Sequence, residues 1–303
     1  MLSAAKPFIV MFVRTVNLQH FSAILAQGEC ARDYYKTPVM TMNSEFDTSA
    51  ASNHPSFYAI VPARYASSRF PGKPLTPILG QPMFLRVVRR VLECDLFSGV
   101  CLATDDQRIA DSARQHGVCT VLTGTEHSSG TERAGEAAEK LGLSSHSVVV
   151  NVQGDEPALI PDMLRELLTP FFRDDSVLVT TWARSIGDEE AGDPNLVKVV
   201  CDQGGQALYF SRSLIPCPRN PEHAAYLGHI GLYAMRYSVL RKFSLLSPGT
   251  LEQAENLEQL RLLENGIPIR VKRTRHSIRG VDTPEDVEDV ERIIQEQQKC
   301  GLF

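Results

Sequence analysis

The chain contains 303 residues, of which 43% are hydrophobic, and its formal net charge of -5 agrees with a pI near 5.9. This length supports one large α/β core, or one core with a small subdomain, and the acidic balance argues against a general nucleic-acid-binding protein. No apolar run approaches the ~20 residues of a membrane span. The seven cysteines form no C-x-x-C pair, which predicts reduced thiols and a cytoplasmic protein. The acidic balance and the lack of a long apolar run predict that it has no nucleic-acid or membrane partners.

Residues 1–56 differ in composition from the rest of the chain. An apolar patch, Phe8–Val13, is followed by a tail at 41–56 that is rich in Ser, Thr, Asn and Ala and has no helical or strand periodicity. Arg14 interrupts the apolar patch, which disfavours a secretory signal. The sequence predicts a weakly ordered extension, or a translation start at Met40 or Met42, ahead of a folded domain at 57–299.

From Phe57 onward, strand and helix patterns alternate. Strands are predicted at 57–61, 99–103, 118–122 and 148–152, with helices at 82–94, 107–116 and 131–141 between them. This order is typical of a doubly wound, mostly parallel α/β sheet. Later strands at 177–184, 196–201, 207–211 and 228–235 have few helices between them, which indicates a small antiparallel addition over the ligand edge. Helices at 237–246, 251–265 and 283–296 complete the domain.

A basic loop follows the first predicted strand. Pro62 is expected to end that strand, and the prolines and glycine that follow exclude an immediate helix. No acidic residue lies between Asp47 and Glu93, an interval that contains Arg64, Arg69, Lys73, Arg86, Arg89 and Arg90. A solubilising loop would give some of these charges, but the exclusion of every carboxylate favours a ligand with several phosphates, because Arg and Lys together suit a triphosphate.

The two best-known phosphate-binding motifs are absent from this loop. Ser67 stands at the first glycine of the Walker A pattern, and Pro74 follows the lysine. No G-x-G-x-x-G follows the strand either. The sequence therefore excludes an ordinary P-loop NTPase and a typical dinucleotide dehydrogenase.

The motif NVQGDEP (151–157) leaves the strongest predicted strand. Gly154 breaks the strand and brings Asp155 to the same sheet edge as the basic loop. A carboxylate that faces phosphates suits Mg²⁺, which takes one or two carboxylates together with phosphate oxygens and water. The alternative is that Asp155 caps a helix, but Pro157 and Pro161 postpone any helix at this point.

The motif GVDTPED (280–286) has the pattern of a helix start. Thr283 is the predicted N-cap, Pro284 stands at the first helical position and an acid stands at the third. The remaining acids of this helix are most simply a solvated face near its positive end. Asp282 lies just before the cap, and it is the carboxylate left to serve as a second metal ligand.

The chain resembles the 3-deoxy-manno-octulosonate cytidylyltransferases, also called CMP-Kdo synthetases, over about 57–294. In addition to the basic loop, the motifs that carry the resemblance are ATDD (103–106), HSSGTER (127–133), VVNVQGDEP (149–157), NLVKVV (195–200), ALYFSR (207–212), GHIGLYAMR (228–236), LEQLR (257–261) and GVDTPED. Their order is that of the family. The segment Pro216–Arg219 departs from the usual pattern.

The resemblance implies the transfer of CMP from CTP to 3-deoxy-D-manno-octulosonate (Kdo), with release of pyrophosphate, for lipopolysaccharide biosynthesis. It implies a nucleotide-diphospho-sugar transferase-like fold, a Mg²⁺ cofactor, and a homodimer with a lid and dimerisation insertion at about 184–245. The alternatives are a cytidylyltransferase for another sugar acid, such as a sialic acid, or a non-catalytic nucleotide-binding module. Both candidate metal aspartates and the whole basic loop are present, which argues against loss of activity.

The resemblance also assigns roles to individual residues. The catalytic set comprises Arg64, Lys73, Asp155 and Asp282, of which Asp155 and Asp282 are the metal ligands. The nucleotide set comprises Ala63, Arg64, Arg69, Lys73, Ala103, Thr104, Asp105, Ser129, Gly130 and Thr131. The sugar set comprises Gln153, Arg212, His229, Tyr233, Glu255 and Gln259. Arg212 is expected to bind the sugar carboxylate; packing alone would explain His229.

Overall fold

The computed structural model describes residues 54–67, 69–276 and 278–301. The predictions for residues 1–53 lie outside them. The ring of His54 lies 5.3 Å from that of Phe172, and the carbonyl of Ser56 accepts a hydrogen bond from the Val148 amide at 2.9 Å. The folded domain therefore already includes the last residues of the predicted extension.

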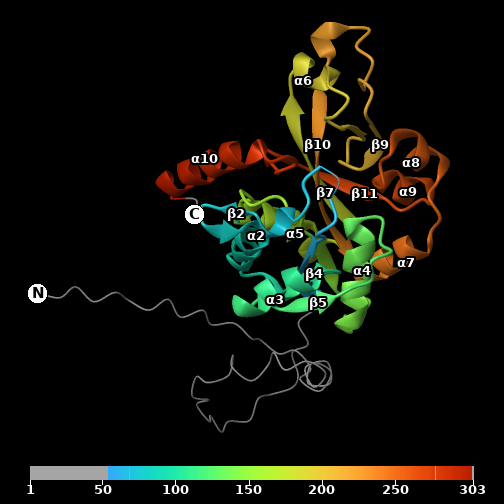
Figure 1. Cartoon of the computed structure of the whole chain (residues 1–303). Coiled ribbons are helices and arrows are strands. Elements are labelled where there is room, and N and C mark those ends of the chain that lie inside the picture. Colours follow the sequence, from blue (N-terminus) through green and yellow to red (C-terminus); the bar gives the residue numbers. More distant parts are fainter. Residues whose placement is uncertain (1–53, 68, 277, 302–303) are drawn as a thin grey trace, which may run out of the picture. The chain divides into compact units, whose positions relative to one another are not determined.

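One sheet organises the domain (Figure 1). Its main path runs, in spatial order, through β11 (Ile269–Thr274), β7 (Val179–Ile186), β10 (Tyr226–Arg236), β6 (Val148–Asn151), β1 (Phe57–Ala63), β4 (Phe97–Thr104) and β5 (Thr120–Leu122). The pairs β1–β4, β1–β6, β4–β5 and β7–β11 are parallel, whereas β10 is antiparallel to both β6 and β7. The predicted mostly parallel sheet is confirmed.

The antiparallel additions lie beside β10. Strands β8 (Lys198–Cys201) and β9 (Ala207–Ser211) pair antiparallel, and β8 also pairs with β10. With α6 (Asp188–Gly192) and η3 (Pro221–His223), they belong to the part that projects above the main sheet in Figure 1. The segment 184–245 is not a separate insertion throughout, because β10 lies within the main sheet.

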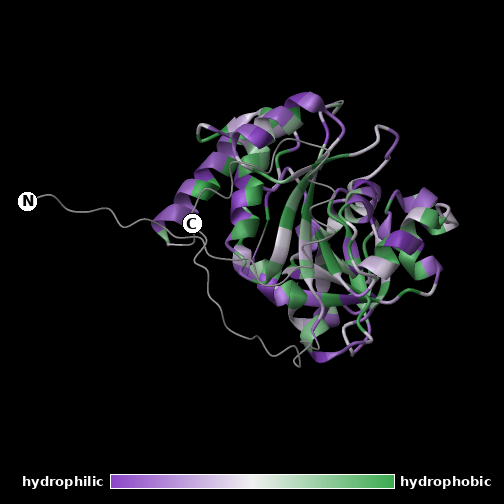
Figure 2. Ribbon diagram, turned by 90° about the horizontal axis from the view of Figure 1, so that it is seen from below, coloured by the Kyte–Doolittle hydropathy of each residue, from purple (hydrophilic) through white to green (hydrophobic). Residues whose placement is uncertain are grey.

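Helices cover both faces of the sheet. On β1, Ala59 and Val61 pack on one face and Ile60 on the other, as the period of two requires. The helices of the first face are α2 (Met83–Leu92), α3 (Gln107–Gln115) and α5 (Pro161–Arg173); those of the second are α4 (Gly130–Lys140), α7 (Tyr237–Leu245) and α9 (Gln259–Glu264). Figure 2 shows the apolar residues gathered on the strands and the hydrophilic residues on the outer surfaces of the helices.

The last helix, α10 (Asp286–Lys299), returns to the first half of the chain. Val290 and Ile294 pack with Ile78 and Met83 in a third apolar cluster. Ile78 belongs to a short hairpin of β2 (Pro77–Ile78) and β3 (Gln81–Pro82), which is preceded by a single turn, η2 (Lys73–Leu75). This packing brings the segment before α10 close to the basic loop. No helix among the described residues has the length and apolar character needed to cross a bilayer.

Strand β1 continues through Pro62, and the prediction that this proline ends it was wrong. Pro62 pairs with Ala103 of β4, whereas β6 pairs only with residues up to Ile60. The Ile60 carbonyl accepts from Val152 on the β6 side, and Pro62 has the same strand parity. Its missing amide therefore points to a side where β6 has already ended, and no ladder hydrogen bond is lost.

The largest differences from the predicted helix boundaries lie at two places. The predicted helix 251–265 is two helices, α8 (Thr250–Glu255) and α9, because Asn256 adopts a left-handed conformation with φ of 54°. Regular helix α10 begins at Asp286 rather than after Thr283. The acid still acts as the pattern predicted, since Asp286 Oδ2 accepts from the Thr283 amide at 2.9 Å.

Helix α5 and strand β11 were not predicted. Pro161 is the first residue of α5, where its fixed φ favours the helix and its missing amide is not needed. Strand β11 lies at the edge of the main sheet and pairs only with β7 on this path. Ile269 and Val271 are buried and alternate with the half-buried Arg270 and Lys272, but the exposed Arg273 breaks this alternation.

A close backbone approach explains Gly154. A Cβ atom at this position would lie 2.5 Å from the carbonyl oxygen of Pro62 and 3.6 Å from Val61. The loop after β6 thus passes directly against the end of β1. Only glycine allows the two segments to meet at this distance.

Gly154→Ala should destabilise the folded protein by about 1–3 kcal/mol, because the backbone of β1 or of the loop must shift to admit the methyl group. Urea denaturation followed by circular dichroism measures the change. Gly192→Ala is the control, since a Cβ at Gly192 meets no atom within 4 Å. Equal stability of the two variants would show that the approach at Gly154 imposes no constraint.

Candidate active site

A cleft of about 210 Å³ opens at the carboxyl ends of β1 and β6. This is the edge where parallel sheets bind ligands. Its walls come from the basic loop, the start of α4, the loop after β6 and the segment before α10. The lining residues are Pro62, Ala63, Arg64, Ser67, Arg69, Lys73, Pro74, His127, Ser128, Ser129, Gly130, Arg133, Gln153, Gly154, Asp155 and Asp282.

Lys73 joins the basic loop to both candidate metal ligands. Its Nζ donates to Asp155 Oδ2 at 2.6 Å and to the carbonyl of Val281 at 2.8 Å, and it lies 4.0 Å from Asp282 Oδ1. The Lys73 side chain is 15% exposed, against 61% for Asp282. The two predicted aspartates therefore converge on one half-buried ammonium group.

The two arginines of the loop have different surroundings. Arg69 Nη2 donates to Asp282 Oδ1 at 3.1 Å, but both side chains are exposed, so solvent screens this pair. Arg64 is exposed in the cleft wall and forms no ion pair with any residue that the structure describes. Arg64 is thus the cation of the loop that a ligand would meet first.

Two other arginines of the acid-free interval, Arg86 and Arg90, serve the fold instead of the cleft. Arg86 donates to the carbonyls of Ile78 and Leu79. Arg90 is buried and donates to the Leu159 carbonyl at 2.9 Å and to Glu93. Arg86 and Arg90 therefore contribute to the acid-free interval but not to the predicted phosphate-binding set, because their guanidinium groups donate to backbone carbonyls.

The predicted nucleotide residues divide into two groups. Ser129 and Gly130 line the cleft, where Ser129 also caps α4 by accepting from the Glu132 amide at 3.2 Å. In contrast, Ala103 and Thr104 are fully buried at the end of β4. Asp105 accepts from Arg133 Nη2 at 2.8 Å, so it contacts the cleft through that guanidinium.

A histidine and glutamate pair in the cleft wall was missed. His127 lines the cleft just before α4, and its Nε2 forms a short contact with Oε2 of Glu136, which lies on α4. Burial raises the pKa of Glu136, but hydrogen bonds from Lys140, His127 and the Gly124 amide outweigh it and lower the pKa to about 2. His127 stands in the HSSGTER motif, two residues before the predicted Ser129–Thr131 turn. This position in the sequence could have indicated that it lies in the cleft.

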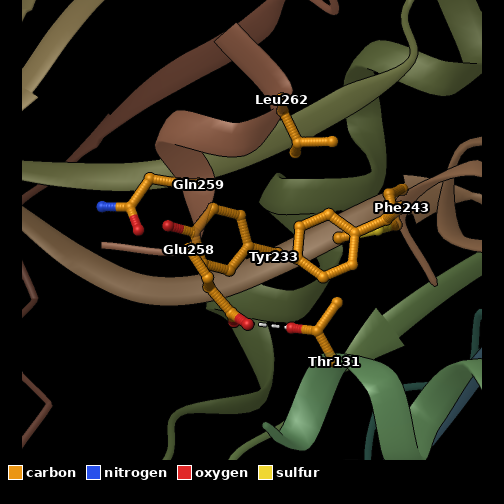
Figure 3. Close-up of a pocket in the computed structure, with 7 residues that line it drawn as sticks. Thr131, Tyr233, Phe243, Glu258, Gln259 and Leu262 are labelled. Atoms are coloured by element: carbon orange, nitrogen blue, oxygen red, sulfur yellow. Dashed lines mark hydrogen bonds between the residues drawn. The ribbon is translucent and has the colours of Figure 1, made fainter. Parts of the chain in front are cut away.

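A second, small cavity of about 10 Å³ lies between α4, β10 and α9 (Figure 3). Such a volume holds about one water molecule. Thr131, Tyr233 and Gln259 line it, and Thr131 Oγ1 donates to Glu258 Oε1 at 2.6 Å. The hydroxyl of Tyr233 and Oε2 of Glu258 are buried without a hydrogen-bond partner among the described residues. Glu258, in the LEQLR motif, was not predicted as a site residue.

His229 belongs to the packing around this cavity. Its ring contacts Phe210 and Tyr233 at centroid distances of 4.9 and 5.4 Å, and its Nε2 lies 2.9 Å from Thr181 Oγ1. Burial lowers the pKa of His229 to about 3, so the imidazole is neutral. A neutral imidazole can offer a hydrogen bond but no charge to an anionic ligand.

Arg212 and Glu255 contact each other in this structure. Glu255 Oε2 accepts from the Arg212 amide at 2.9 Å, and Arg212 Nε donates to the Glu255 carbonyl at 2.9 Å. Arg212 Nη1 donates to the carbonyl of Pro194. The pair thus ties α8 to the end of β9, whereas Gln153 lies in the cleft.

Comparison with known proteins places the chain in a family. Residues 58–274 match the family described as Cytidylyltransferase. The 3-deoxy-manno-octulosonate cytidylyltransferase of Oleidesulfovibrio alaskensis is 53% identical over 242 residues, which are 80% of this chain and 97% of that protein. The enzyme of the same name from Nitratidesulfovibrio vulgaris strain DP4 is 54% identical over 243 residues, with 79% and 96% covered. The chain belongs to the 3-deoxy-manno-octulosonate cytidylyltransferase family.

A solved structure supports the same family membership. The structure of CMP:2-keto-3-deoxy-manno-octonic acid synthetase complexed with CTP superposes with a TM-score of 0.76 at 41% identity, and covers 80% of this chain and 99% of that one. The predicted nucleotidyltransferase fold is therefore confirmed. As a member of this family the chain is a nucleotidyltransferase.

The donor set of the cleft suits Mg²⁺ in part. Asp155 and Asp282 supply two carboxylates, and the ammonium group of Lys73 lies next to both. Burial and the charge of Asp155 raise the pKa of Glu156 to about 8, so Glu156 is mostly protonated and unsuited to join them. No group of three or more His, Cys, Asp or Glu could hold a metal within the described ranges. Phosphate oxygens would have to complete the coordination.

Glu136→Gln should reduce the pH dependence of stability. Because the folded pKa of about 2 lies below the usual 4.5, ionised Glu136 stabilises the fold above about pH 4.5, and this contribution is lost as the pH falls toward 2. The variant should therefore be less stable at neutral pH and lose less unfolding free energy between about pH 5 and pH 3.

Urea denaturation at the two pH values measures this difference. Glu139→Gln is the control, because Glu139 is an exposed carboxylate on the same helix. It should retain the wild-type pH dependence. An identical loss of stability in wild type and Glu136→Gln would contradict the assigned role of Glu136.

Proposed function

We propose that this protein transfers CMP from CTP to the anomeric hydroxyl of Kdo and releases pyrophosphate. The observation that carries the proposal is the cleft in which two carboxylates and the cations of the basic loop meet at the carboxyl ends of parallel strands. The similarity of the chain to proteins named for this reaction supports the same substrates. The product would enter lipopolysaccharide biosynthesis in the cytoplasm.

The reaction needs positioning and charge neutralisation more than a protein base. The sugar hydroxyl attacks the α-phosphorus in line as the bond to pyrophosphate breaks. Arg64, Arg69 and Lys73 neutralise the triphosphate and the charge that builds on the leaving pyrophosphate. Asp155 and Asp282 would hold Mg²⁺, which when bound supplies polarisation of phosphate oxygens and acidification of the attacking hydroxyl.

The small cavity beside α4 is the candidate binding site for the sugar. The unpaired Tyr233 hydroxyl and Glu258 Oε2 are buried groups that a polyol could satisfy. Burial raises the pKa of the Glu258 carboxyl, against the hydrogen bond from Thr131. Because the cavity holds about one water, β10 and α9 would separate as the sugar binds. Arg212 would reach the sugar carboxylate after releasing its carbonyl contacts.

We also propose a homodimer that uses the projecting part of the domain. Strand β9 has one described partner strand, β8, so no described strand is paired along its other edge. Leu208 on this strand is 62% exposed, and Leu214 after it is 40% exposed. An open edge with exposed apolar side chains favours association with a second chain.

The proposed reaction is tested by pyrophosphate release with CTP and Kdo in the presence of Mg²⁺. Wild-type protein should release pyrophosphate with Kdo and not with CTP alone. Turnover of a sialic acid but not of Kdo would show that another sugar acid is the substrate. Nucleotide binding without turnover of either would leave a non-catalytic module.

Asp155→Asn and Asp282→Asn should each abolish turnover while the fold is retained, because each removes a hard anionic ligand without a change of volume. Circular-dichroism melting checks the fold, and the pyrophosphate assay measures the rate. A near-native melt with a loss of less than about tenfold, roughly 1.4 kcal/mol, would argue against metal ligation by that residue.

Tyr233→Phe should raise KM for Kdo about tenfold and leave KM for CTP unchanged, since one hydrogen bond to the sugar is lost. Stability should not fall, because the hydroxyl that is removed has no partner in the folded chain. Arg212→Ala is the companion variant. If it raises KM for Kdo while Tyr233→Phe has no effect, the sugar lies against Arg212 and outside the small cavity.

A further inference from the structure

Lys73 occupies the point on which the two candidate metal ligands converge. Its ammonium group is 2.6 Å from Asp155 Oδ2 and 4.0 Å from Asp282 Oδ1. The Val281 carbonyl accepts a further hydrogen bond from it at 2.8 Å, and the Val281 amide donates to the Asp155 carbonyl at 2.9 Å. Two carboxylates and a carbonyl around one cation form the kind of oxygen shell that a hard metal ion takes.

We propose that Lys73 is an internal counter-cation, which holds the metal position between Asp155 and Asp282 until a nucleoside triphosphate draws it away. This inference rests on the proposed function, in which the same lysine neutralises the triphosphate. While its ammonium remains between the carboxylates, it neutralises charge that would attract a divalent ion and repels that ion directly.

The internal counter-cation, Lys73, also stabilises the structure of the cleft. Without a cation between them, Asp155 and Asp282 would be two like charges on segments joined by the backbone hydrogen bond from the Val281 amide to the Asp155 carbonyl. Arg69 cannot replace Lys73 here, because its contact with Asp282 is exposed and screened. Lys73 therefore keeps the cleft assembled in the absence of ligands.

The local backbone allows the ammonium group to leave without unfolding. Lys73 is the first residue of η2, after Gly72, which has φ of 74°. The Gly72 amide donates to the Tyr65 carbonyl at 3.0 Å, and Pro74 is buried. The backbone on both sides is fixed, so the movement is confined to the flexible stem of the lysine side chain.

The consequence is a coupling between nucleotide and metal. Phosphate oxygens that attract Lys73 release Asp155 for the metal, and a bound metal repels Lys73 toward the phosphates. By linkage, each ligand strengthens the binding of the other by the same factor. The free protein should bind divalent ions weakly, and the cleft should acquire its metal together with the triphosphate.

Binding of Mn²⁺ alone to the full-length protein tests the proposal, followed by the electron paramagnetic resonance signal of free Mn²⁺. Lys73→Met should bind one Mn²⁺ about tenfold or more tightly than wild type in the absence of nucleotide. Lys73→Gln, which keeps a hydrogen-bond donor but no charge, should show the same gain and serves if the Met variant does not fold. Lys242→Met is the control, because it removes one charge from an exposed position on α7.

A double variant locates the ion. Adding Asp155→Asn to Lys73→Met should abolish the gain in Mn²⁺ affinity. The proposal is overturned if both Lys73 variants bind Mn²⁺ as weakly as wild type, or if the gain persists without the Asp155 carboxylate. These measurements need no turnover. Absence of pyrophosphate release by wild type, with the gain present, would refute the proposed reaction and retain the counter-cation.

Discussion

The architecture of the site depends on the ion network around Lys73. This side chain links residues that are 82 and 208 positions away along the chain, at Asp155 and Val281. The network is balanced, because Lys73 and Arg69 stand against Asp155 and Asp282. Except at Arg64, a ligand would therefore meet charges that are already paired. The free energy of binding at these groups is the difference between their contacts with each other and their contacts with the ligand.

The sheet supplies the precision that such an exchange requires. Strands β1 and β6 are adjacent and parallel, so their carboxyl ends deliver the basic loop and the aspartate loop to one place. Gly154 lets the second loop pass directly against Pro62. Helix α10 then packs on the β2–β3 hairpin and brings Asp282 to the opposite wall. The packing of three apolar clusters thereby fixes the walls of the cleft, whose polar side chains form few contacts with one another, some of them exposed.

The cleft and the small cavity, which we propose for the nucleotide and the sugar, differ in how open they are and in whether their polar groups are paired. The cleft is open, with Arg64 exposed and His127 braced by Glu136. The cavity near Tyr233 is almost closed and contains buried polar atoms without partners. An unsatisfied buried group is costly, so a sugar that supplies hydroxyl partners would recover free energy as it opens this region. Thr131, next to Gly130 of the cleft, connects the cleft to the small cavity.

The sequence by itself determined the α/β class, most strands and helices, the basic loop and the two aspartates, because these follow from local periodicity, turn residues and short motifs. Only the tertiary structure decided which charges meet. Arg86 and Arg90 lie outside the cleft, because helix α2 directs them to backbone carbonyls. Arg212 donates to the Glu255 carbonyl. Glu258 gained its partner Thr131 from the distant helix α4. Burial and partner choice depend on contacts between remote segments, which no local pattern encodes.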